Sequence, residues 1–173
     1  MNAVRRFCAR LVEELQIPGD CDLDGLVQHI ARVTGRELTA RPAPLGPRVS
    51  GLTLATDTHG LILYQRHTTV WHQTGIVLHE LGHLACRHES SPEAMVEAAS
   101  LLAQVTDPAQ MAQHFSAGVH ARHHGYHKRA ELEAEEFAVQ VTARLPLLAV
   151  AGSSQAVDRL APSLEHRRPS GAP

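Results

Sequence analysis

GIVLHELGHLACRH, residues 75–88, contains the motif on which the interpretation of this sequence depends. Its centre is His-Glu-x-x-His, with His79 and His83 four positions apart and Glu80 between them. Residues four apart on a helix lie one turn above each other, so both imidazoles can point to a common centre. Zinc commonly takes four ligands, which leaves places for one more protein ligand and a water. Glu80 is placed to accept a proton from zinc-activated water as a general base, the arrangement that a zinc hydrolase requires.

The surroundings of the motif predict a buried helix next to a β-hairpin. Residues 69–87 have an apolar density typical of a helix that is buried on most sides. Residues 49–55 and 60–65 alternate between apolar and polar side chains on either side of a turn sequence, Asp57-Thr58-His59-Gly60. Residues 41–47 contain three prolines and a glycine, which predict a loop or an irregular edge.

The helical period recurs in other parts of the chain. These parts are residues 2–16, followed by Pro18-Gly19; residues 22–35, with Asp22 as N-cap and Gly35 as the stop; residues 93–121, which predict one or two Ala-rich helices; and residues 128–145, ended by Pro146. We therefore expect one α+β domain over residues 1–150, mainly helical, with a small β-sheet or hairpin beside the motif helix. Residues 151–173 have little period and predict a flexible tail.

The composition argues against several classes of function. A length of 173 residues with 43% hydrophobic content suits a single core rather than two domains. The net charge of −2 gives no electrostatic reason to expect nucleic-acid or membrane binding. Three cysteines without a C-x-x-C pair argue against a disulfide framework and a thiolate zinc site. No apolar run approaches the roughly 18 residues of a membrane span or resembles a signal peptide, so we expect a cytoplasmic protein.

A third zinc ligand is expected on the helix predicted at residues 128–145. This segment carries four glutamates, of which Glu131 and Glu135 share one helix face. If the helix returns beside the motif helix, Glu131 can reach the metal and Glu135, one turn later, can hold a ligand in place. The alternative is a charged face in contact with solvent, which is the commonest fate of such runs.

The two motifs together resemble a known family. HQTGIVLHELGH at residues 72–83, the hairpin before it and ELEAEEFA at residues 131–138 are similar to the ImmA/IrrE family of metallo-endopeptidases, especially to short members of actinobacterial type. The resemblance extends over residues 10–146. It implies a zincin-like fold, a bound Zn²⁺ and the activity of a zinc-dependent endopeptidase on a protein substrate. Family members that act as regulators cut a helix-turn-helix transcriptional repressor, so the resemblance implies a role in transcription regulation.

The resemblance also implies roles for individual residues. His79, His83 and Glu131 would be the zinc ligands, and Glu80 would be the catalytic base. Glu133 is excluded because neighbours two apart on a helix diverge by about 200°, and the family's E-x-E-A pattern selects the first glutamate. Glu135 stands where many members have asparagine, and its charge can raise the basicity of a ligand or supply a fourth one.

A function of a different class stays open alongside the peptidase. The chain can instead be a non-catalytic zinc-binding interaction protein or one partner of a toxin–antitoxin-like pair. Glu80 favours the enzyme, because a binding module needs no base beside its metal ligands.

Other residues near the motif have two interpretations each. His72 lies seven positions before His79 and can line a substrate groove, but a hydrogen-bonded histidine at the helix start is favoured. Tyr126 can either donate a hydrogen bond to a tetrahedral intermediate or only pack. The histidines at 120, 123, 124 and 127 can form a second metal site, but a polar loop near the cleft is favoured.

Overall fold

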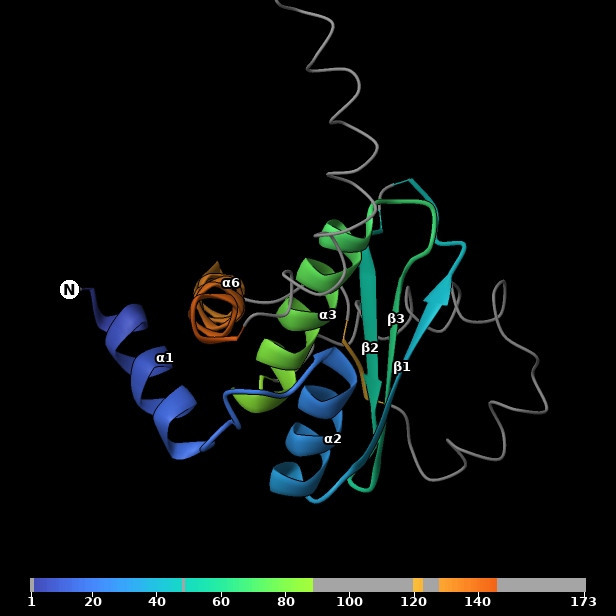
Figure 1. The fold of residues 1–173 in the computed structure, drawn as a ribbon. Helices are drawn as coiled ribbons and strands as arrows, with labels where there is room; N and C mark the ends of the chain where they lie inside the picture. Colours follow the sequence, from blue (N-terminus) through green and yellow to red (C-terminus); the bar gives the residue numbers. More distant parts are fainter. Residues whose placement is uncertain (1, 48, 89–119, 123–127, 146–173) are drawn as a thin grey trace, which may run out of the picture.

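The structure, a computed structural model, describes residues 2–47, 49–88, 120–122 and 128–145. In this part of the chain there are four helices and a four-stranded sheet, which confirms the mixed α+β class (Figure 1). The helices and strands are α1 (Ala3–Glu14), α2 (Leu23–Thr34), β1 (Glu37–Ala43), β2 (Gly51–Ala55), β3 (His59–Gln65), α3 (Val70–Ala85), β4 (His120–Arg122) and α6 (Lys128–Arg144). The helices predicted within 93–119 and the tail predicted at 151–173 lie outside the described residues.

Capping residues mark the starts of α1, α2 and α3 and the end of α2. The N-cap residues are Asn2 in α1, Asp22 in α2 and Thr69 in α3, and the side-chain oxygen of each accepts a hydrogen bond from a backbone N–H of the first turn. Gly35 ends α2 in the left-handed conformation, with φ of 68°. The predictions of helices at 2–16, 22–35, 69–87 and 128–145 are therefore confirmed within a few residues.

The sheet has the strand order β1-β3-β2-β4. Strands β2 and β3 form the predicted antiparallel hairpin, with Thr53 opposite Ile62. Strand β1 pairs in parallel with β3 and includes residues 41–43, so the prediction of an irregular segment is wrong there. Among the described strands, β1 is paired on one side only, with β3. Pro42 is tolerated in such a strand because a missing N–H on the side without a neighbour removes no ladder hydrogen bond.

Residues 120–122 form a short strand instead of the predicted helix end or loop. Strand β4 runs antiparallel to β2, with Thr53 opposite Arg122. This pairing joins segments far apart in sequence, and a three-residue strand is too short to produce a recognisable alternation.

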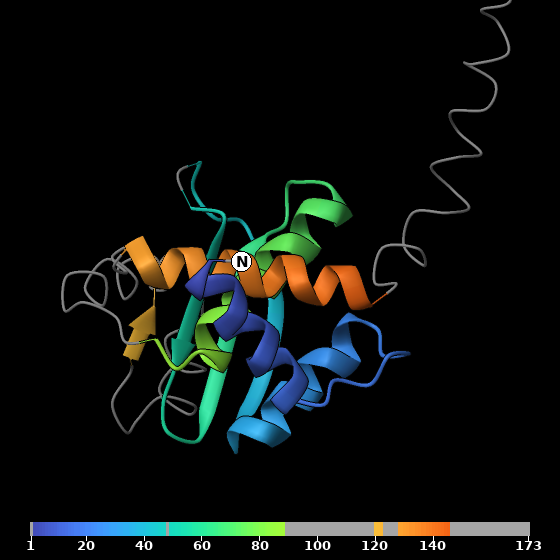
Figure 2. The same cartoon turned by 90° about the vertical axis from the view of Figure 1, so that its left-hand side faces the viewer.

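The described elements are arranged in layers around α3 (Figures 1 and 2). Helices α2 and α3 pack on the sheet, α6 packs on the side of α3 that faces away from the sheet, and α1 packs on α6. The core between these layers is mainly aliphatic, with Phe137 as its largest fully buried side chain. Within the described ranges, no helix is long and apolar enough to cross a membrane.

A close approach between α3 and α6 occurs at Gly82. A Cβ atom at this position would lie 2.9 Å from the carbonyl oxygen of Ala134 and 3.2 Å from Cδ1 of Phe137. The backbone of α6 is therefore too near to leave room for a side chain on α3. Since Glu131 precedes Ala134 by one helical turn, this approach also determines how near Glu131 comes to the motif histidines.

We expect Gly82→Ala to separate the two helices and lower the free energy of unfolding by about 1–3 kcal/mol, as overpacking of a tight interface does. Gly75→Ala is the matched control in the same helix, because a Cβ there meets nothing within 4 Å. The control should be neutral or stabilising, since alanine favours a helix over glycine by about 0.8–1 kcal/mol. Urea unfolding of both variants measures the difference, and equal stability would show that the contact does not limit the helix spacing.

Candidate metal centre

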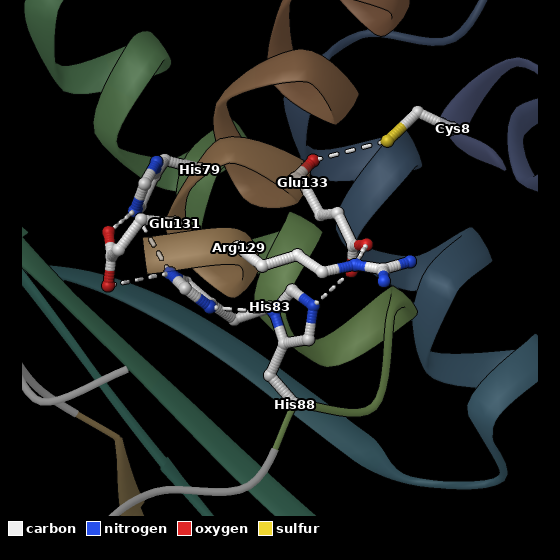
Figure 3. Close-up of polar contacts among 7 residues, drawn as sticks. All are labelled: Cys8, His79, His83, His88, Arg129, Glu131 and Glu133. Carbon is white, nitrogen blue, oxygen red and sulfur yellow. Dashed lines mark hydrogen bonds and ion pairs between the residues drawn. The ribbon is translucent and has the colours of Figure 1, made fainter. Parts of the chain in front are cut away.

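Three potential metal ligands come together where α6 passes α3 (Figure 3). The Nε2 atoms of His79 and His83 are 3.0 Å apart. Glu131, in the first turn of α6, places Oε2 at 3.4 Å from Nε2 of His79 and Oε1 at 3.9 Å from Nε2 of His83. Donors of a tetrahedral zinc lie about 3.3 Å from one another, because each is about 2.0–2.1 Å from the metal. The group is therefore close enough to bind a metal ion with small movements.

The electrostatic environment of this group is negative. Burial lowers the pKa of His79, but the hydrogen bond to Glu131 and the charges of Glu80, Glu131 and Glu135 raise it more, so that the pKa lies above its ordinary value. The same carboxylates that favour a proton on His79 would favour a metal cation in its place. A proton and a metal ion therefore compete for this site.

The group is closed on one side and accessible on the other. The side chain of His83 is 2% exposed, whereas those of His79 and Glu131 are 33% and 44% exposed. Among the described residues, the group has these three members. Two histidines, one carboxylate and an accessible side are typical of zinc sites that bind a water or substrate, whereas structural zinc sites have four protein ligands.

Glu80 lies on the sheet side of α3, where it is buried. Its Oε2 accepts a hydrogen bond of 2.6 Å from the hydroxyl of Thr53 on β2. A Cβ atom at Gly51 would come within 2.7 Å of Oε1 of Glu80 and 2.5 Å of the Ile76 side chain, so the glycine provides the space that the carboxylate occupies. The sequence predicted the hairpin but not that Thr53 and Gly51 would contact Glu80, because that depends on how the hairpin packs on α3.

The second ring nitrogen of His83 begins a chain of polar contacts (Figure 3). Nδ1 of His83 lies 3.0 Å from Nδ1 of His88, and Nε2 of His88 lies 3.1 Å from Oε2 of Glu133. Oε1 of Glu133 accepts a 2.7 Å hydrogen bond from Arg129. Sequence reasoning assigned no role to His88, although it ends the stretch that contains the motif, and excluded Glu133 only as a metal ligand.

The remaining predicted residues have different positions. Glu135 is exposed and acts on His79 through its charge. His88, which the sequence did not suggest, lies within hydrogen-bond distance of the motif histidine His83. His72 is exposed at the start of α3, with Nδ1 2.9 Å from the hydroxyl of Thr68. This agrees with the favoured interpretation of a hydrogen-bonded histidine at the helix start. Tyr126 and residues 123, 124 and 127 of the histidine cluster lie outside the described residues.

Comparison with known proteins gives no match. A scan against protein-family models finds no family that fits this chain. Searches of curated proteins and of solved structures also find no similar chain.

We expect Glu131→Gln to weaken zinc binding by more than about 100-fold, beyond the 10–100-fold typical of residues that only support a ligand. Glu135→Gln removes the same charge one turn away and should have a much smaller effect, because Glu135 acts on the site only through its charge. Glu133→Gln should weaken zinc binding by an amount between those of Glu131→Gln and Glu135→Gln. Competition titrations against a chelator measure all three, and a larger loss in Glu133→Gln or Glu135→Gln would assign the ligand to another residue.

Proposed function

We propose that this chain is a zinc-dependent endopeptidase with a zincin-like fold. The observation that carries the proposal is the position of Glu80. It is a buried carboxylate, hydrogen-bonded to Thr53, on the same helix as a three-donor group that is close enough to bind a metal. A protein that only bound zinc would have no use for a buried acidic group at this position, because burial of a charge is costly.

In this proposal, His79, His83 and Glu131 hold the metal. Zinc in such a site polarises a carbonyl group and lowers the pKa of water towards neutrality. The donor set of two imidazoles and one carboxylate is chemically suited to zinc, which binds nitrogen and oxygen ligands of this kind. The exposure of His79 and Glu131 supports an approach of the substrate from their side.

Glu80 acts as the general base in the proposed reaction. Its carboxylate accepts the proton of the attacking water and delivers it to the nitrogen of the leaving amine as the peptide bond breaks. The hydrogen bond from Thr53 fixes Oε2 and thereby the plane of the carboxylate. We propose Oε1, the oxygen next to Gly51, as the atom that carries the proton.

The proposed substrate is a protein, and specifically a helix-turn-helix transcriptional repressor. This part of the proposal rests on the resemblance of the two motifs, residues 72–83 and 131–138, to the ImmA/IrrE family. Its consequence would be relief of repression of the genes that the repressor controls. We place the reaction in the cytoplasm, where such a repressor would be found.

A zinc-binding or partner-binding module without catalysis is the second candidate. One observation favours it. His79, His83 and Glu131 contact one another through a hydrogen bond and, where the histidines are protonated, ion pairs, and these contacts are also compatible with a structural role. The two candidates differ in whether Glu80 is needed.

We expect Glu80→Gln to retain zinc and the folded structure but to lower peptide-bond cleavage by about 10²–10⁴-fold, the contribution typical of general acid–base assistance. The measurement is mass spectrometry of candidate helix-turn-helix repressors, beginning with any that is encoded beside this gene, after incubation with the purified protein with and without chelator. Expression of the repressed genes in cells gives a second readout.

Glu14→Gln provides the control, because it makes the same chemical change at an exposed position on α1. This variant should cleave like the wild type. Loss of cleavage together with loss of derepression in Glu80→Gln would support the enzyme. If derepression persists in Glu80→Gln, or if the repressor stays intact in every sample, the peptidase proposal is wrong and binding is the better account.

A further inference from the structure

The contacts behind His83 assign a function to three residues outside the metal-binding group. We propose that His88, held by Glu133 and Arg129, places the proton of His83 on Nδ1 and thereby directs the lone pair of Nε2 towards the metal. His88, Glu133 and Arg129 are thus positioning residues. The inference rests on the proposed metal site but not on the proposed proteolysis.

Four side chains are connected by successive polar contacts (Figure 3). His83 and His88 face each other through their Nδ1 atoms at 3.0 Å, and His88 reaches Glu133 through Nε2 at 3.1 Å. Arg129 is the last of the four, and its Nε lies 2.7 Å from Oε1 of Glu133. Both ring nitrogens of His88 therefore lie at hydrogen-bond distance from a defined partner.

The proton positions follow from what each group can donate. A carboxylate only accepts, so the proton between Glu133 and His88 belongs to Nε2 of His88. A neutral His88 then has an unprotonated Nδ1, which can only accept. The proton between the two Nδ1 atoms therefore belongs to His83. A neutral His83 with its proton on Nδ1 has a lone pair on Nε2, the atom that faces His79 and Glu131.

The opposite direction of proton donation, from His88 to His83, is less favourable. It would place the lone pair of Nε2 of a neutral His88 against the negative charge of Glu133, or it would require a second proton on His88. It would also put a hydrogen on Nε2 of His83, and a protonated nitrogen cannot bind zinc. Donation of protons from His83 to His88 and from His88 to Glu133 is thus the only direction compatible with both the carboxylate of Glu133 and a metal at Nε2 of His83.

Glu133 is fixed well enough to determine this direction. The side chains of His88 and Glu133 are each 10% exposed, so water has little access to their contact. The guanidinium of Arg129 donates a 2.7 Å hydrogen bond to Oε1 of Glu133, and a positively charged donor at this distance favours the carboxylate form. The thiol of Cys8 on α1 also lies 3.4 Å from the backbone carbonyl of Glu133, which anchors this turn of α6.

The position of the proton can be measured directly in the metal-free protein. Nitrogen chemical shifts of ¹⁵N-labelled histidines distinguish a proton on Nδ1 from one on Nε2. The sample should be held at about pH 8.5, where an ordinary histidine is neutral. We expect His83 to carry its proton on Nδ1 in the wild type and to lose this preference in His88→Phe.

Zinc affinity provides the second readout. His88→Phe and Glu133→Gln should each weaken zinc by about 10–100-fold in a competition titration, the usual effect of removing a partner that orients a metal-binding histidine. His88→Asn should retain most of the affinity, because Oδ1 of asparagine can accept a hydrogen bond near the position of Nδ1. His67→Phe makes the same change at an exposed histidine outside the chain of contacts and should bind zinc like the wild type.

The outcomes separate this inference from the peptidase proposal. A proton on Nε2 of His83 in the wild type overturns the inference, and so does unchanged zinc affinity in His88→Phe. If His88→Phe does not fold, the wild-type proton position and the comparison of His88→Asn with Glu133→Gln still decide. A proton on Nδ1 and weakened zinc binding in the variants, in a protein that cleaves no repressor, would support the inference while contradicting the peptidase.

Discussion

The contact between Gly82 and Ala134 is the constraint on which the candidate site depends. Helix α6 can approach α3 this closely only because position 82 has no side chain. At this spacing, Glu131 contacts the motif histidines and Glu133, two positions later, contacts His88. One backbone approach thus brings Glu131 to the two motif histidines and Glu133 to His88, because the two carboxylates diverge by about 200° around α6.

The proposed metal ligands and the proposed base lie on different faces of α3. Successive helix residues are rotated by about 100°, so His79 and Glu80 point in different directions. His79 faces Glu131 on α6, while Glu80 lies against Thr53 on the sheet. The proposed metal ligands are therefore positioned by the packing of two helices, and the proposed base is positioned by the packing of α3 on β2. A change in one interface can alter metal binding without displacing the base.

Local patterns in the sequence predicted most of the described elements. The helical period and the caps at Asp22 and Gly35 predicted the helices, and the alternation around residues 57–60 predicted the hairpin. Strand β1 was missed because Pro42, together with the two prolines that follow the strand, resembles a loop. Its parallel pairing with β3 depends on contacts that no local pattern encodes. Strand β4 was missed because three residues are too few for a pattern.

The site was predictable to the extent that helix geometry determines it. The spacing of His79 and His83 predicted a shared centre, and the resemblance selected Glu131 as the third member of the group that the structure brings together. The contact of His88 with Glu133 spans 45 residues and depends on side-chain orientations that spacing does not determine. For the same reason, the sequence suggested Glu135 as the residue that holds a ligand in place and did not suggest His88, whose Nδ1 lies 3.0 Å from Nδ1 of His83.

The central claim is that two histidines and one carboxylate of this chain form a zinc site. X-ray absorption spectroscopy of the zinc-loaded protein tests it most directly, because it identifies the atoms bound to the metal. The account predicts nitrogen and oxygen donors at about 2.0–2.1 Å, with the outer scattering pattern of two imidazoles. Sulfur scattering at about 2.3 Å would assign the metal to cysteines and contradict the account. An imidazole pattern that persists in a His79→Ala, His83→Ala double variant would contradict it equally.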